Sequence, residues 1–189
     1  MNVYDFDKTI YDGDSTVDFY LYCLGRRPGI LRSVPRQAAA FVRYGLKRIP
    51  KTRLKEIFFT YLQYAGDVDA LVADFWAARR HKIFKWYAAQ KRPDDVIISA
   101  SPVFLLRPIC DDLGVGELIA SKVAVPGGQF DGSNCYGPEK VLRFLALHRR
   151  DEVDEFYSDS LSDSPMAKLA KAAFLVKKET RSPWPGTSL

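Results

Sequence analysis

The sequence has few of the residues that build disulfide frameworks or zinc sites. Its three cysteines, Cys23, Cys110 and Cys135, are far apart and form no CxxC pair, and the chain has only two histidines. An odd number of scattered cysteines without a histidine cluster argues against both kinds of site. We therefore expect the three thiols to be buried as small apolar side chains.

Long hydrophobic runs and a signal peptide are also missing. The longest apolar stretches, such as residues 38–42, are interrupted by arginines well before the ~20 residues that a membrane span needs. The first residues lack the basic start and apolar stretch of a signal peptide. We expect a cytoplasmic protein, with peripheral attachment to the inner face of the membrane as the alternative.

The composition that is present suits one folded core with a small insertion. The chain has 189 residues, of which 47% are hydrophobic, enough for one sizeable core but not for two full domains. Its formal charge of +5 favours anionic partners. A phosphorylated small molecule, an anionic lipid surface and nucleic acid all meet that description.

Short apolar runs alternate with helical patterns over much of the chain. Residues 2–6 and 96–99 indicate buried strands, and further strands are expected later in the chain, in alternation with helices. The expected later elements are helix 103–113, strand 118–125, a Gly-rich flap at 126–137, helix 138–149, strand 155–158, helix 164–171 and strand 173–177. This alternation predicts an α/β fold with a doubly wound parallel sheet.

Residues 15–90 follow a helical spacing throughout and predict an all-helical cap inserted into the core. Breaks at 27–29, 49–50 and 65–67 divide this segment into about four helices. The core is then expected to comprise residues 1–14 and 91–189. The last stretch, 179–189, has no periodicity and indicates a tail in which Trp184 docks on the core.

Two carboxylates at alternate positions stand at the end of the first expected strand. In Asp5-Phe6-Asp7-Lys8-Thr9 both acids can converge on one metal and one phosphate as the chain turns. Taken alone, this DxDxT pattern is equally consistent with an acidic strand end. Three further segments decide between the two interpretations.

These three segments lie at the ends of later elements. Ser99 follows the second apolar strand, where the next helix start adds N–H groups that favour an anion, although a capping serine is the alternative. Lys140 opens a helix and supplies a point charge for a phosphate, or is an ordinary surface lysine. Asp159 and Asp163 occupy a serine-rich turn, and their hard oxygens suit Mg²⁺.

In this order and spacing the four motifs resemble those of the haloacid dehalogenase superfamily, in its phosphoserine-phosphatase-like branch with a helical cap. The resemblance covers residues 1 to about 178. It implies that Asp5 is the nucleophile and a Mg²⁺ ligand, and that Asp7 is the general acid/base and binds the metal through its backbone carbonyl. The resemblance further implies phosphate binding by Ser99, Ala100 and Lys140, metal ligation by Asp159 and support of the metal site by Asp163.

One residue departs from the family pattern, because Ser158 stands where the family usually has glycine. The acidic pair that follows is intact. An ionised carboxylate and a phosphate dianion repel each other, so Mg²⁺ and Lys140 must offset that repulsion. The sequence therefore predicts a Mg²⁺-dependent phosphomonoester hydrolase that forms an aspartyl-phosphate intermediate.

The resemblance assigns the choice of substrate to the cap. Asp14 stands near the position where phosphoserine phosphatases carry an acid that binds the substrate amine, although it also suits a helix cap. Arg53 is a second candidate substrate-binding residue. It ends a basic segment, from Arg26 on, that is typical of helices on anionic lipid and resembles the cap of phosphatidylglycerophosphate phosphatases. We favour the simpler interpretation, in which the apolar side of this segment packs on neighbouring cap helices.

The leading prediction is a phosphatase acting on a small phosphorylated metabolite, with a phosphoserine-like compound as one example. The alternatives are a lipid phosphate phosphatase at a membrane surface, a phosphotransferase, and a noncatalytic binding protein, which the full set of acids disfavours. Asp7 also argues against dehalogenation. Nucleic acid is the weakest partner, because the cap aromatics fall at helical spacing and indicate core packing.

Overall fold

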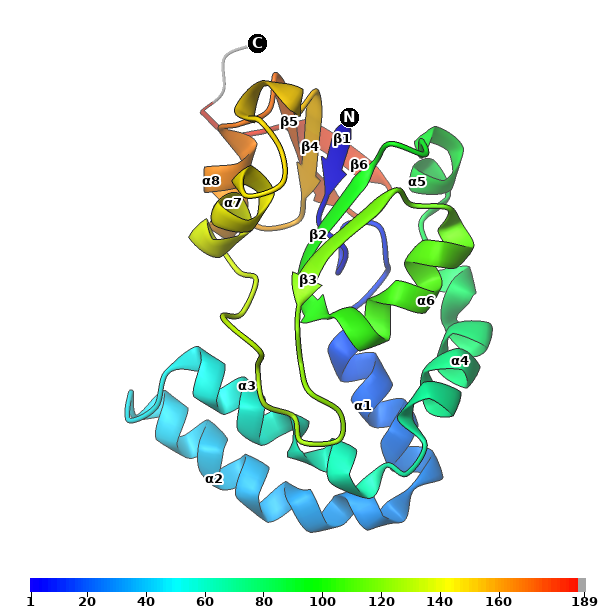
Figure 1. Cartoon of the computed structure of the whole chain (residues 1–189), viewed down its shortest axis with the longest axis vertical. Helices are drawn as coiled ribbons and strands as arrows, with labels where there is room; N and C mark the ends of the chain where they lie inside the picture. The colour runs from blue at the N-terminus through cyan, green and yellow to red at the C-terminus, as the bar shows by residue number, and fades with distance from the viewer. Residues whose placement is uncertain (187–189) are drawn as a thin grey trace.

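Six strands form one sheet in the order β3-β2-β1-β4-β5-β6 in the computed structural model, which describes residues 1–186 (Figure 1). The strands are β1 Asn2–Tyr4, β2 Val96–Pro102, β3 Glu117–Ser121, β4 Glu155–Ser158, β5 Ala172–Lys177 and β6 Thr180–Pro183. Strands β1 to β5 pair in parallel, and β6 runs antiparallel to β5. This arrangement confirms the predicted doubly wound α/β fold.

The helices fall into the cap and the two layers that cover the sheet. They are α1 Ser15–Arg26, α2 Val34–Gly45, α3 Lys51–Phe59, α4 Val68–Arg79, α5 Lys85–Gln90, α6 Val103–Leu113, α7 Pro138–Leu145 and α8 Ser164–Ala167. Helix α1 begins where Asp14 accepts a hydrogen bond from the backbone N–H of Val17 (3.0 Å). Helix α6 ends at Gly114, which adopts the left-handed conformation that glycine tolerates best.

Strand β2 is buried on both faces because its side chains alternate between two apolar clusters. Ile97 packs in the cluster that contains Leu106 of α6. Val96 and Ile98 point to the other face and pack in the cluster that contains Phe144 of α7. Helices on both faces explain why the strand reads as a continuous apolar run.

The cap consists of two parts with different attachments. Helices α1 and α4 join the main core cluster, and the indole N–H of Trp76 in α4 donates to the carbonyl of Leu105 (2.6 Å). Helix α3 also places Phe59 in the main cluster, but it shares with α2 a small separate cluster of Ala40, Leu54 and Ile57. Figure 1 shows α2 and α3 projecting at the end of the molecule opposite the C-terminus.

The apolar side of the basic segment is not packed as expected. Phe41, Val42 and Leu46 are 54%, 63% and 59% exposed. The expectation that these side chains pack on neighbouring cap helices is therefore wrong. Helix α2 has α3 and the 3-10 turn η1 (Pro28–Ser33) as its main neighbours, and one side of it is left uncovered.

Two elements near the expected boundaries differ from the sequence interpretation. Helix α5 lies within the expected cap range, yet it packs on the sheet, where the ring of Tyr87 lies 5.0 Å from that of Tyr4. Residues 180–183 form the edge strand β6 rather than an irregular tail. Trp184 is buried and lies 5.9 Å from the ring of Phe156, as expected, whereas the tail residues 187–189 lie outside the described range.

The three cysteines are buried and unpaired, as predicted from their spacing. None of the helices within residues 1–186 combines the length and apolarity that crossing a membrane requires.

Candidate active site

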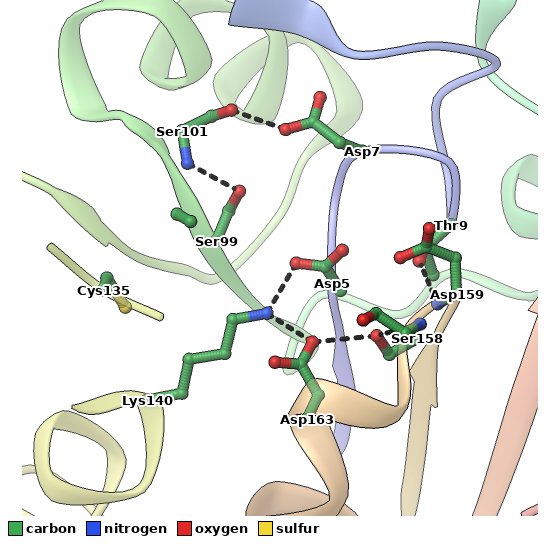
Figure 2. A network of polar contacts seen from close by, with 12 residues as sticks. Asp5, Asp7, Thr9, Ser99, Ser101, Cys135, Lys140, Ser158, Asp159 and Asp163 are labelled. Atoms are coloured by element: carbon green, nitrogen blue, oxygen red, sulfur yellow. Dashed lines mark hydrogen bonds and ion pairs between the residues drawn. The ribbon is translucent and has the colours of Figure 1, made fainter. Parts of the chain in front are cut away.

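The candidate catalytic residues meet at the carboxyl edge of the sheet. Strand β1 lies between β2 and β4, and its register pairs Tyr4 with Ile97 on one side and Tyr157 on the other. Asp5, Ser99 and Asp159 follow these paired positions, so residues far apart in sequence emerge side by side. Figure 2 shows this group, with Lys140 reaching in from α7.

Lys140 lies between two buried carboxylates. Its Nζ is 2.6 Å from Oδ1 of Asp5 and 2.7 Å from Oδ2 of Asp163. The side chain of Lys140 is only 2% exposed. The ammonium therefore holds Asp5, the predicted nucleophile of the first motif, close to Asp163 of the last motif.

Burial and charge oppose each other at this triad. Burial raises the pKa of Asp5 to about 7, the ammonium of Lys140 opposes that rise, and the charge of Asp163 adds to it. Burial alone would lower the pKa of Lys140, but Asp5 and Asp163 together hold it above its ordinary value. Lys140 thus stays protonated, and a further cation would favour the ionised form of Asp5.

Asp7 is held apart from this triad by the cap and by strand β2. Its carboxylate accepts from the backbone N–H of Ser15 (2.6 Å) and from the hydroxyl of Ser101. Burial, followed by the charge of Asp14, raises the pKa of Asp7 to about 6. A carboxyl group with this pKa can hold and release a proton near neutral pH.

The candidate phosphate-binding residues Ser99 and Ala100 belong to β2, the strand beside β1. The Oγ of Ser99 is buried and accepts from the backbone N–H of Ser101 (3.1 Å). The carbonyl of Ala100 accepts from Nζ of Lys55 in the cap helix α3 (3.0 Å). Lys55 also donates to Oδ1 of Asn134 (2.9 Å), so it joins the cap to two parts of the core.

The turn after β4 is organised by hydroxyl groups. The backbone N–H of Asp159 donates to Oγ1 of Thr9 (2.9 Å), which ties this turn to the first motif. Ser158, at the position where the family usually has glycine, donates to Oδ2 of Asp163 (2.8 Å). The departure from the family pattern thus adds a hydrogen bond to the acidic turn.

The residues present fit a magnesium ion. Asp5 and Asp163 share the single ammonium of Lys140, and Oδ1 of Asp163 is buried without a hydrogen-bond partner in the described structure. Burial, with the charge of Asp163 adding to it, raises the pKa of Asp159. Buried oxygens with excess negative charge are the donor set that Mg²⁺ requires.

No group of three His, Cys, Asp or Glu side chains within residues 1–186 is arranged to hold a metal ion. The ligand set expected from the sequence needs only two side-chain carboxylates, from Asp5 and Asp159, because Asp7 contributes its backbone carbonyl. Mg²⁺ commonly takes one or two carboxylates and keeps several waters. The described geometry and the expected set are therefore compatible.

A cavity of about 340 Å³ opens between the cap and these catalytic groups. Asp7, Ala100 and Ser101 line its inner end, and the cap supplies most of the rest. The cap residues that line it are Thr16, Val17, Phe41, Tyr44, Lys51, Leu54, Lys55, Phe58 and Phe59, and Asp14 lines it just before the cap begins. The walls are mainly apolar, with two lysines on the side of α3.

The two candidate substrate-binding residues have different positions. Asp14 lines the cavity and also caps α1 through its hydrogen bond to Val17. Arg53 does not line this cavity; its guanidinium pairs with Glu56 (2.9 Å) and lies at a separate hollow beside Arg43. The structure thus brings Asp14, but not Arg53, to the catalytic groups.

Three residues of the site were not singled out as functional from the sequence. Ser101 binds Asp7, Thr9 anchors the turn at Asp159, and Lys55 binds Ala100. Thr9 belongs to the DxDxT motif, and Ser101 follows Ser99 by two residues on the same strand, so both carried a local signal. Lys55 carried none, because its contacts depend on how the cap folds back on the core.

Comparison with known proteins shows the family of the chain. The family model of haloacid dehalogenase-like hydrolases matches residues 3–168. Protein CicA of Caulobacter vibrioides is 26% identical over 180 residues, which cover 88% of this chain and 81% of that protein.

Solved structures share the fold. A protein with unknown function from Bordetella pertussis Tohama I superposes with a TM-score of 0.75 and 22% identity, over 98% of this chain and 91% of that one. A phosphoserine phosphohydrolase-like protein from Francisella tularensis superposes with a TM-score of 0.58 and 13% identity, over 92% and 86%. Together with the match to the family model, which spans most of the sequence, the four motifs establish that the chain belongs to the haloacid dehalogenase-like hydrolases.

Proposed function

We propose that the protein is a Mg²⁺-dependent phosphatase that hydrolyses phosphate monoesters through an aspartyl-phosphate on Asp5. The observation that carries this proposal is the buried contact of Lys140 with both Asp5 and Asp163, at 2.6 and 2.7 Å. A buried ion group contributes little to stability compared with apolar packing. Its presence at the edge where α/β sheets bind ligands favours a catalytic role.

The chain supplies each residue that the reaction needs. Asp5 attacks the phosphorus, and the bond to the leaving oxygen breaks as Asp7 donates a proton to that oxygen. Asp7 then takes a proton from the water that attacks the aspartyl-phosphate, which releases inorganic phosphate and regenerates Asp5. Ser99 and Lys140 hold the phosphate oxygens during both steps.

Magnesium, when bound, offsets the repulsion between the Asp5 carboxylate and the phosphate dianion. Asp5, Asp159 and the backbone carbonyl of Asp7 would hold it, and Asp163 would support them through its contact with Lys140. Uncatalysed phosphate monoester hydrolysis is so slow that enzymes accelerate it by up to ~10²¹. Charge stabilisation by such a site is the main source of that acceleration.

The cavity favours a leaving group with an apolar portion and a second anionic group. Leu54, Phe58 and Phe59 give it apolar walls, while Lys51 and Lys55 provide positive charge. A small phosphorylated metabolite of this composition is the first candidate substrate. A lipid phosphate of the phosphatidylglycerophosphate type is the second, and the apolar residues of the cavity are the observation that favours it.

The test is the rate of phosphate release from a panel of esters, measured with Mg²⁺ and with EDTA. The panel includes phosphoserine, sugar phosphates and phosphatidylglycerophosphate in micelles. We expect turnover that requires Mg²⁺ and that Asp5→Asn abolishes, because an amide oxygen is a poor nucleophile. Asp12→Asn is the matched control, since Asp12 is exposed and lies outside the site.

Two results would contradict the proposal. Turnover that persists in Asp5→Asn would remove Asp5 as the nucleophile, and full turnover in EDTA would remove the metal. Addition of acceptor alcohols distinguishes the remaining alternative, because a phosphotransferase would form new phosphate esters in place of inorganic phosphate.

A further inference from the structure

The charge of the chain is divided unequally between the cap and the rest. Residues 26–55 contain ten lysines and arginines and no aspartate or glutamate. The other 159 residues contain 18 basic and 23 acidic side chains, so the net charge of +5 arises within this one segment. Nine of the ten cations are exposed. A surface of this kind attracts anionic partners.

Large apolar side chains are exposed in the same segment. Of the 15 that are exposed within residues 1–186, six lie between residues 31 and 46, and these are Leu31, Val34, Phe41, Val42, Tyr44 and Leu46. Single exposed apolar residues are ordinary on protein surfaces, whereas a concentration of them marks an interaction site. Cations and apolar side chains thus occupy one small part of the molecule.

Helix α2 presents these residues on a side that the cap does not cover. Gln37 fastens the helix to α3, because its amide donates to the carbonyl of Phe58 (2.8 Å). Phe41 follows Gln37 by four residues and therefore borders this contact with α3, whereas Val34 and Val42, at i and i+8, lie further round the helix. Figure 1 shows α2 at the outer edge of the cap. Val34 and Val42 are 36% and 63% exposed there.

This surface continues into the catalytic cavity. Phe41 and Tyr44 are 54% and 40% exposed, and both also line the cavity that contains Asp7 and Ser101. A partner bound along α2 would therefore lie beside the opening through which a substrate reaches the catalytic groups.

We propose that α2 and the exposed cations around it bind the surface of an anionic lipid bilayer. Helices of this type lie in the interface, with apolar side chains inserted at the level of the headgroups. Lysines and arginines near the surface add electrostatic attraction to anionic lipids. Nucleic acid would use the cations but would leave Val42 and Leu46 in water, so the combination favours lipid. The proposal is independent of the proposed reaction, because binding requires no turnover.

Sedimentation of the full chain with vesicles tests the proposal. The vesicles contain phosphatidylcholine alone or phosphatidylcholine mixed with phosphatidylglycerol. We expect at least about tenfold tighter binding to the anionic vesicles, weakened by salt, because each cation near the surface contributes roughly fivefold. The double substitution Val42→Ser/Leu46→Ser should weaken this binding about tenfold or more. Neither residue lines the catalytic cavity.

The matched control is Leu142→Ser/Leu147→Ser, with Leu142 in helix α7 and Leu147 two residues beyond its end. These leucines are 66% and 63% exposed, close to the values of Val42 and Leu46, so their loss should leave vesicle binding unchanged. Arg43→Gln/Arg48→Gln should weaken binding to anionic vesicles only. Circular dichroism verifies that each variant is folded.

Three results would overturn the proposal. They are equal binding to neutral and anionic vesicles, equal effects of the α2 and α7 variants, and a dimer that Val42→Ser/Leu46→Ser converts to a monomer in a protein that binds no vesicles. The last result would mean that a second copy of the chain covers this side of α2.

Discussion

Lys55 connects the cap to the phosphate-binding strand at the level of a single side chain. An ammonium has three N–H donors, and two of them bond to the carbonyl of Ala100 and to Asn134. Lys55 also lines the catalytic cavity. Burial, followed by the positive charge of Lys51, lowers its pKa to about 8. Its charge therefore changes within a range of pH in which enzymes are commonly assayed.

This pKa predicts a pH dependence of substrate binding. Lys55 is protonated below pH 8 and loses its charge above it, so KM for a phosphate ester with a second anionic group should rise from about pH 8 upward, by at most about tenfold per pH unit. The value of kcat should change little. Steady-state kinetics between pH 7 and pH 9.5 measure both constants.

Two variants and one substrate make the pH prediction specific to Lys55. Lys55→Gln should give a high KM that no longer depends on pH, whereas Lys51→Gln should keep the rise but move it to higher pH, because the charge of Lys51 helps to lower the pKa of Lys55. An ester without a second anionic group should show no rise in either protein. If KM still rises with pH in Lys55→Gln, another titrating group must cause the rise.

At the residue scale the sequence predicts the carboxylates better than their partners. Asp5 and Asp163 converge on Lys140 because the strands that precede the two acids, β1 and β4, are neighbours in the sheet; the alternation of strands and helices predicts that the sheet is parallel but not the order of its strands. Lys55 was missed because a cap residue reaches the core only through the three-dimensional return of an inserted segment. Arg53 was selected on charge alone, and charge does not indicate the direction of a side chain on a helix.

At the scale of elements, strand β6 shows how tertiary contacts create structure where the sequence has no periodicity. All four of its residues are exposed, so no alternation marks it as a strand. Its position depends on pairing with β5, where Phe174 lies opposite Pro183, and on Trp184, whose backbone N–H donates to the carbonyl of Ala173 (2.8 Å). Trp184, which directly follows β6, thus holds this last strand in place at the edge of the sheet.

The same contacts predict the effect of removing that aromatic side chain. Trp184 is 4% exposed and packs near Phe156. Trp184→Ala should lower the free energy of unfolding by about 3–5 kcal/mol, the range for large buried aromatics. Glu179→Ala, an exposed change in the same segment, should stay within about 0.5 kcal/mol. Urea denaturation measures both, and a loss below about 1 kcal/mol for Trp184→Ala would show that β6 is weakly attached.

Helix α5 was assigned to the cap for a related reason. Its sequence continues the helical spacing of the preceding residues, and periodicity alone does not distinguish a helix that covers a sheet from one in a separate insertion. The aromatic contacts decide: Trp86 lies 5.5 Å from Tyr157 and Tyr87 lies 5.0 Å from Tyr4. The helical pattern therefore predicts the helix, and only the packing shows to which part it belongs.

At the scale of the whole molecule, the doubly wound parallel sheet was predictable, because it depends on local patterns that agree with one another. The division of the cap was not. An amphipathic pattern shows that a helix has an apolar side but does not show whether protein covers that side. The apolar sides of α1 and α4 pack in the main core cluster. Much of the apolar side of α2, by contrast, stays exposed.

This division predicts unequal local stability across the cap. The cluster shared by α2 and α3 contains only three buried residues, Ala40, Leu54 and Ile57, and few buried apolar contacts correspond to a low free energy of local opening. Amides of α2 should therefore exchange with deuterium at least about tenfold faster than those of α1 and α4. Hydrogen exchange followed by mass spectrometry measures this difference peptide by peptide.

Anionic vesicles provide the decisive comparison in the exchange experiment. If α2 binds lipid, its amides should become protected when vesicles with phosphatidylglycerol are added, while those of α7, at the other end of the molecule, should not change. Equal protection of α2, α1 and α4 without lipid would mean that the small cluster holds its helices as firmly as the main core does. The two parts of the cap would then pack in different clusters but have the same local stability.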